Sequence, residues 1–127
     1  MKYRGALLSV AVGILAAALP VLAHHSFAAE FDQNKPLKIS GACTKVEWMN
    51  PHARFYVDVK DDSGAVTNWD FELASPNVLL MQGWRRDSLK AGDQVTVTLY
   101  PAKNGKPEGV LAKMVTANGK EWCCETK

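Results

Sequence analysis

Residues 37–60, LKISGACTKVEWMNPHARFYVDVK, decide the fold. The apolar positions up to Cys43 recur at every second residue, which is the period of a half-buried β-strand. The pattern then slips by one position, so that Val46 and Trp48 continue the same face. We expect one long first strand, with a β-bulge at the slip and a bend at Gly41.

Four further stretches alternate in the same way. Residues 54–60 and 67–73 read as two strands joined by a hairpin turn at 62–64, and residues 95–100 and 110–114 read as a fourth and a fifth strand. The sequence therefore predicts a mostly β protein.

Between the third and fourth strands, Ser75 and Pro76 read as an N-cap followed by a proline at the first helical position. A short helix should follow and end at Gly83. Five strands, one short helix and a bulged first strand match a small five-stranded OB-like Greek-key barrel. An immunoglobulin-like sandwich is the alternative, although it needs seven strands.

The first 23 residues have the three parts of a secretory signal peptide. Lys2 and Arg4 precede the apolar residues 6–19, and a short Val-Leu-Ala segment ends at Ala23, where we expect cleavage. An uncleaved membrane anchor is the alternative reading, because the apolar run approaches the length of a membrane span. The expected organisation is a signal peptide (1–23), an N-terminal arm (24–36) and a barrel domain (37–127).

Export to the periplasm or the cell exterior limits which partners the protein can meet. The signal peptide holds two of the fifteen Lys and Arg residues and none of the thirteen acidic ones, so the mature chain carries no formal net charge. A neutral exported surface lacks the field that non-specific nucleic-acid binding uses. We therefore expect no nucleic acid as partner and no membrane association after cleavage, but a periplasmic protein or a small ligand.

Three cysteines, Cys43, Cys123 and Cys124, would lie in an oxidising compartment, where disulfides persist. The expected arrangement is one bridge from Cys43 to Cys123 or Cys124, which leaves one free thiol. A thiolate metal site is the alternative, but no CxxC pair supports it.

Two of the three histidines, His24 and His25, follow the expected cleavage site. A terminal His24 offers its α-amine and its ring nitrogen as a chelate, and a third nitrogen from His25 or His52 completes a set suited to Cu(II). Copper is accordingly the expected metal, if any is bound. The alternative is that the two histidines only supply a polar cleavage segment and that His52 caps a loop.

Trp48, Asn50 and Trp84 form the second candidate site, a concave aromatic surface at the barrel mouth that could bind a ligand. The alternative is that the tryptophans fill the core, which is the expectation for Trp69 more than for Trp84. Met49 and Met114 could act as soft copper ligands, although isolated methionines usually fill gaps.

No catalytic motif accompanies these candidates. The chain has no GxSxG elbow, no Gly-rich phosphate loop and no Rossmann pattern. We therefore expect a binding protein rather than an enzyme, with a copper-dependent oxidoreductase left open.

Four motifs carry a resemblance to a known family: residues 24–32 (HHSFAAEFD), residues 45–52 (KVEWMNPH), residues 75–77 (SPN) and residues 83–84 (GW). In these the chain resembles a family of small exported bacterial proteins of unknown function, and the resemblance implies export and a barrel. Cys43, the Cys123–Cys124 pair and Arg54 depart from the family pattern. His24 alone is also similar to the first residue of histidine-brace copper proteins, which include polysaccharide monooxygenases.

Overall fold

The protein is described by a computed structural model, which covers residues 27–123 with the side chain of Cys123 excepted. The chain divides into two units, residues 1–30 and residues 31–127. Residues 27–30 form a helical turn in the first unit. Across the described part of the chain, no helix has the length and apolar character needed to span a membrane. The expected signal peptide lies outside the described residues.

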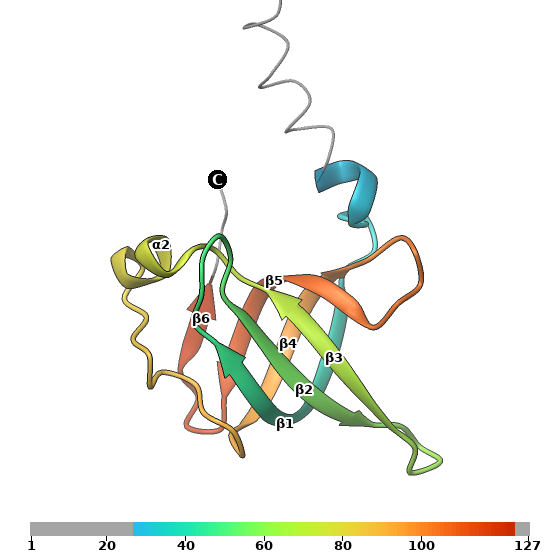
Figure 1. Ribbon diagram of the computed structural model, residues 1–127. Helices are drawn as coiled ribbons and strands as arrows, with labels where there is room; N and C mark the ends of the chain where they lie inside the picture. The colour runs from blue at the N-terminus through green and yellow to red at the C-terminus, as the bar shows by residue number, and fades with distance from the viewer. Residues whose placement is uncertain (1–26, 124–127) are drawn as a thin grey trace, which may run out of the picture. The chain divides into compact units, whose positions relative to one another are not determined.

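The second unit contains six strands and one short helix (Figure 1). In chain order they are β1 (Leu37–Glu47), β2 (Arg54–Lys60), β3 (Val66–Glu72), α2 (Pro76–Met81), β4 (Gln94–Pro101), β5 (Glu108–Thr116) and β6 (Glu121–Cys123).

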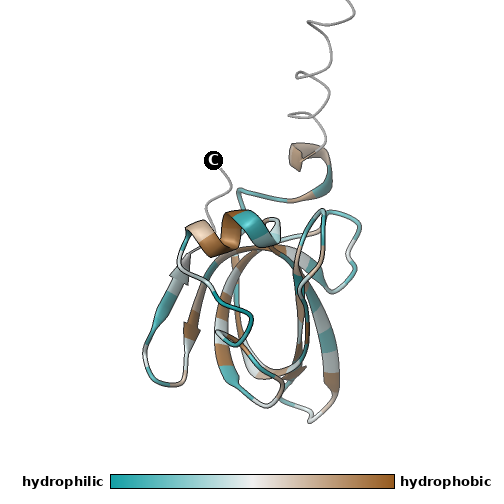
Figure 2. Ribbon diagram, turned by 60° about the vertical axis from the view of Figure 1, so that its left-hand side comes forward, coloured by the Kyte–Doolittle hydropathy of each residue, from teal (hydrophilic) through white to brown (hydrophobic). Residues whose placement is uncertain are grey.

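The strands form one sheet that closes on itself. Antiparallel pairing gives the order β3-β2-β1-β4-β5-β6, and a parallel pairing of β3 with β5 closes the first five strands into a barrel. Phe71 lies opposite Gly109 at this closure. Figure 2 shows the strands running round the interior. The predicted OB-like, five-stranded barrel with one short helix is confirmed.

The expected bulge in the first strand is present. The register between β1 and β2 shifts between Cys43 and Lys45. Gly41 precedes the bulge where the two strands approach closely, because a Cβ there would overlap the carbonyl oxygen of Asp58. The same strand pairs with β4 at its other edge, so the bend lets β1 take part in both sides of the barrel.

A second bulge lies where β4 meets β5. The register shifts between Thr98 and Leu99, which lie opposite Lys113 and Leu111, so Ala112 is the extra residue on β5. Leu111 and Met114 consequently both face the core, at 1% and 0% exposure. A strictly alternating strand would instead place Ala112 on the face of Val110 and Met114.

The helix α2 begins as the sequence predicted. Ser75 caps it, since its side chain accepts a hydrogen bond from the backbone nitrogen of Val78 at 3.5 Å, and Pro76 opens the first turn. Leu79 is fully buried. The core joins this residue to the inward faces of the strands and consists of Cys43, Ala53, Phe55, Val57, Phe71, Leu73, Ala74, Leu79, Trp84, Leu89, Val95, Val97, Leu99, Leu111, Met114 and Trp122.

Candidate functional site

The segment between β1 and β2 contains the one histidine that the structure describes, His52. The neighbouring Ala53 is fully buried and fixes the end of this segment. Its backbone nitrogen donates to the carbonyl oxygen of Ala74 at 3.1 Å, and its own carbonyl oxygen accepts from the nitrogen of Leu73 at 2.9 Å. The preceding Asn50–Pro51 peptide bond is cis. His52 is therefore attached to the residues that follow β3.

The ring of His52 has a hydrogen-bond partner at Nδ1 and none among the described residues at Nε2. Nδ1 lies 3.1 Å from the carbonyl oxygen of Leu73 and 3.6 Å from Oε1 of Glu72. A carbonyl oxygen can only accept, so Nδ1 carries the ring proton when the imidazole is neutral, and the lone pair is then on Nε2. The side chain is 49% exposed. Histidines that bind a metal commonly have their second nitrogen held by a carbonyl or a carboxylate, and a histidine that only caps a loop can make the same contact.

Beside His52, the outer face of β2 and β3 carries an ion-pair network. Nε and Nη2 of Arg54 each donate to one oxygen of Asp70, at 2.9 Å, which is the bidentate geometry of a strong pair. Nη1 of Arg54 lies 3.6 Å from Oε2 of Glu72. The hydrogen bonds that Arg54 donates to Asp70 raise the pKa of Arg54. Glu72 thus lies between the guanidinium and the imidazole.

A second group extends the network to β1. The hydroxyl of Tyr56 donates to Oε2 of Glu47 at 3.0 Å, and Lys45 forms an ion pair with the same carboxylate. These two contacts, with Lys45 the stronger, lower the pKa of Glu47. Burial first, and then the bond to Glu47, raise the pKa of Tyr56. The outer face therefore presents carboxylates whose charges are partly matched by neighbouring cations.

Sequence reasoning did not find this network. Its members on β2 and β3 are outward-facing residues that alternate with inward-facing ones, and that alternation was visible in the sequence. The pairing of Arg54 with Asp70 depends on the register, in which Arg54 lies opposite Glu72 and Tyr56 opposite Asp70. Arg54 is the cation that joins the side chains of Asp70 and Glu72.

The predicted metal ligands are only partly described. His52 has the geometry given above, whereas His24 and His25 lie outside the described residues. Within residues 27–123 no cluster of three or more His, Cys, Asp or Glu side chains could hold a metal ion. Of the soft candidates, Met114 is fully buried in the core, and Met49 is 50% exposed.

The predicted aromatic surface needs a correction. Trp84 is 2% exposed and packs against Trp122, with ring centroids 4.7 Å apart, so it belongs to the core and cannot contact a ligand at the barrel mouth. Trp48 is half-buried against the core, and Asn50 is exposed. Trp69, for which burial in the core was expected more than for Trp84, is only partly buried.

Cys43 has a free thiol inside the barrel, 1% exposed. Burial raises the pKa of this thiol to about 11, against a smaller opposite effect of its hydrogen bond to the carbonyl oxygen of Lys45. The side chain of Cys123 and all of Cys124 lie outside the described residues. A bridge to either of them stays a prediction.

The barrel is similar to a solved structure of a nucleic-acid-binding protein. The crystal structure of Rim1, a mitochondrial single-stranded DNA-binding protein from S. cerevisiae, matches with a TM-score of 0.51 at 9% sequence identity, over 65% of this chain and 93% of that chain. A likeness at this identity shows the fold alone. Among curated proteins none matches this sequence.

This likeness corrects one expectation, the exclusion of nucleic acid as a partner. That exclusion was drawn from a formal net charge of zero. It was wrong, since the similar fold of Rim1 belongs to a protein that binds single-stranded DNA. Net charge averages over the whole surface, whereas binding depends on the local charge of one face.

The scan of protein families gives a match that spans most of the chain. It covers residues 11–113 and includes all strands from β1 to β4 and the first two thirds of β5. The chain belongs to the family of unknown function DUF6152.

Proposed function

We propose that this protein is an exported small binding protein that holds Cu(II), or a transition metal with similar preferences, through a terminal His24 and the imidazole of His52. The observation that carries the proposal is the geometry of His52. Its Nδ1 is bonded to a backbone carbonyl at 3.1 Å and its side chain is half exposed, so that Nε2 is available as a ligand.

The remaining ligands come from the residues expected at the mature N-terminus. After cleavage behind Ala23, the α-amine and the ring of His24 form a chelate, and His25 adds a further imidazole. Nitrogen ligands of this kind suit Cu(II) in a tetragonal arrangement.

The acidic residues near His52 support the same assignment. Glu72 lies 3.6 Å from Nδ1, and it increases the electron density of the imidazole when that ring binds a cation. Arg54 holds the other oxygen of Glu72 at 3.6 Å and keeps the carboxylate oriented. Glu72 is thus a positioning residue for His52.

Isothermal titration with Cu(II) chloride, on protein that starts at His24, tests the proposal. We expect one copper per chain, and a loss of affinity of at least about tenfold in His24→Ala and in His52→Ala, because each variant removes a nitrogen ligand. An added glycine before His24, which removes the free α-amine of that residue, should weaken binding similarly. Asp62→Asn, an exposed carboxylate in the β2–β3 turn, is the matched control and should bind as the wild type does.

Unchanged copper affinity in His52→Ala would show that the barrel supplies no ligand through His52. Unchanged copper affinity in His24→Ala would show that the side chain of His24 is not a ligand. A chain that takes up no copper in the micromolar range would contradict the whole proposal.

A second candidate function, a metal-free module that binds an exported protein, is favoured by the apolar surface of α2. Val78, Leu80 and Met81 are 39%, 42% and 87% exposed on a helix of six residues. Exposed apolar groups that lie together often mark a contact surface. A partner captured from periplasmic extract by the wild type should be lost in a variant with serine at all three positions. Equal recovery by that variant would contradict this candidate.

A further inference from the structure

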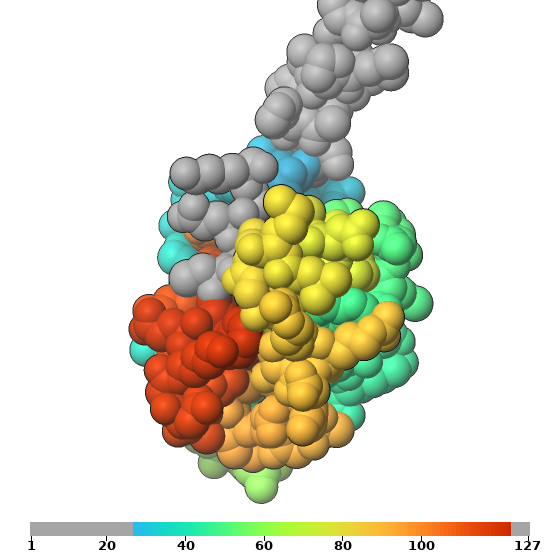
Figure 3. Space-filling view, turned by 90° about the vertical axis from the view of Figure 1, so that its left-hand side faces the viewer, coloured from blue at the N-terminus to red at the C-terminus, as the bar shows by residue number. Residues whose placement is uncertain are grey.

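A cavity of about 240 Å³ lies between the segment that precedes β4 and the β5–β6 hairpin. These two parts of the chain lie side by side in Figure 3, the first in orange and the second in red. The cavity is smaller than the 300–1,000 Å³ of pockets that hold drug-sized ligands, so it suits a small molecule. The side chains that carry the argument are Ser88, Asp93, Gln94, Asn118, Lys120 and Trp122.

Trp122 supplies a buried donor to this wall. Its side chain is 8% exposed, and within residues 27–123 its Nε1–H finds no hydrogen-bond acceptor. A buried donor without an acceptor costs roughly 1–3 kcal/mol. A ligand atom that accepts from Nε1 would recover part of this cost.

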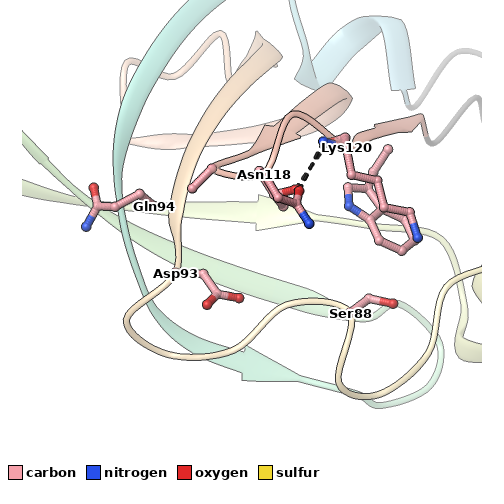
Figure 4. Close-up of a pocket in the computed structure, with 8 residues that line it drawn as sticks. Ser88, Asp93, Gln94, Asn118 and Lys120 are labelled. Atoms are coloured by element: carbon pink, nitrogen blue, oxygen red, sulfur yellow. Dashed lines mark hydrogen bonds between the residues drawn. The ribbon is translucent and has the colours of Figure 1, made fainter.

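Two more donors come from the β5–β6 turn. The ammonium group of Lys120 lies over the Trp122 ring, 4.0 Å from its centroid, and forms no salt bridge with any described residue. The amide oxygen of Asn118 accepts from the Thr116 hydroxyl at 2.6 Å and from the Lys120 nitrogen at 3.1 Å. Its amide nitrogen retains its two protons for a ligand. Figure 4 shows Asn118 and Lys120 on one side of the cavity.

The opposite side of the cavity offers an acceptor. Asp93 and Ser88 lie there, on the segment before β4 (Figure 4). Oδ2 of Asp93 accepts from the backbone nitrogen of Lys90 at 2.9 Å, and no described residue donates a hydrogen bond to its other oxygen. The Ser88 hydroxyl oxygen accepts from the nitrogen of Arg85 at 2.8 Å, which leaves its proton to donate.

We propose that this cavity binds a small polyhydroxylated carboxylate. The carboxylate contacts Lys120, the Asn118 amide and Trp122 Nε1, and a hydroxyl group donates to Asp93. Nε1 has no exposed surface in this state, so the carboxylate reaches it as the exposed Lys120 side chain swings off the ring to pair with the ligand.

A neighbouring cavity gives such a ligand room for further hydroxyl groups. It measures about 180 Å³, shares Gln94 and Thr116 with the first cavity, and adds the hydroxyls of Ser40 and Thr96 to the lining. Neither cavity includes His52, so the inference is independent of the copper proposal.

Titration with gluconate, followed by the indole ¹⁵N–H signals of the four tryptophans, tests this inference on metal-free protein. The Trp122 signal should shift with saturation while the signals of Trp48 and Trp69 stay in place. Sorbitol, which has a hydroxymethyl group where gluconate has the carboxylate, should leave all four signals unchanged. Acetate, which has no hydroxyl groups, should bind more weakly than gluconate.

Lys120→Gln should weaken gluconate binding about tenfold, because it removes one charge-assisted contact. Lys60→Gln, an exposed lysine that lines neither cavity, is the matched control and should bind as the wild type does. Asp93→Asn should weaken gluconate and leave acetate unchanged. An unmoved Trp122 signal, an equal response to sorbitol, or unchanged binding in Lys120→Gln would overturn the proposal.

Discussion

Nδ1 of His52 lies 3.1 Å from the carbonyl oxygen of Leu73, and this contact fixes the tautomer of the ring. Because the carbonyl has no proton to give, the neutral imidazole must carry its proton on Nδ1. The lone pair is then on Nε2, for which no described residue is a partner, so it is free to bind a metal ion.

Nuclear magnetic resonance can test this tautomer in metal-free protein at about pH 8. Two-bond and three-bond ¹⁵N–¹H correlations of His52 should show a protonated Nδ1 and an unprotonated Nε2. Leu73 cannot be the partner of the ring if the correlations show the proton on Nε2.

In reduced protein, the buried thiol of Cys43 should make stability depend on alkaline pH. Burial raises its pKa from 9.0 to about 11, so above pH 9 the unfolded chain releases a proton that the folded chain retains. The free energy of unfolding therefore falls as pH rises from 9 to 11, by about 2–3 kcal/mol in total. Urea unfolding at several pH values measures this fall.

The comparison for this effect is Cys43→Ala, in which other groups with raised pKa values, such as Tyr56, still titrate. The variant should be less stable at pH 7 and should lose less stability between pH 9 and 11. Parallel curves for the two proteins would show that Cys43 does not cause the dependence.

Gly41→Ala should destabilise the barrel strongly for a substitution that adds a single methyl group. The added Cβ would overlap the carbonyl oxygen of Asp58 and contact Val57 on the facing strand, so β1 and β2 must separate at their bend. Overpacking of this kind costs about 1–3 kcal/mol. The control is Ser40→Ala, one residue away, which loses an exposed hydrogen bond to Thr96 at 2.9 Å and should cost less than about 1 kcal/mol. Equal urea midpoints for the two variants would contradict the close approach.

Trp84 should behave as a core residue. Trp84→Ala removes a side chain that is 2% exposed and should cost about 3–5 kcal/mol of unfolding free energy. Met81→Ala, on α2 at 87% exposure, should change it by less than about 0.5 kcal/mol. Both values come from chemical denaturation at neutral pH. A cost below about 1 kcal/mol for Trp84→Ala would contradict the burial of this residue in the core.

The sequence predicted the barrel because its strands alternate clearly. The slip after Cys43 was visible as a one-residue shift in the apolar alternation, and it became the bulge between Cys43 and Lys45. The second bulge was not visible, because Leu111 and Ala112 are both apolar and either could have faced the core. The register of β4 against β5 decides between them, and it depends on contacts distant in sequence.

The same limit applies to the candidate site. Trp84 follows α2 in a segment without periodicity, so its burial beside Trp122 could not be read from spacing. The pairing of Arg54 with Asp70 likewise needs the register of two strands. His52 was identified from its residue type and its motif, but only the structure relates its ring to Leu73.

The central claim is that the chain is processed at His24 and binds copper there with His52. Native mass spectrometry of the protein purified from the periplasm of a copper-supplied culture reads the N-terminus and the bound metal together. A chain that begins at His24 and carries one copper ion, which His52→Ala loses, is the predicted result. A chain that begins elsewhere, or that stays metal-free after exposure to copper, would contradict the claim.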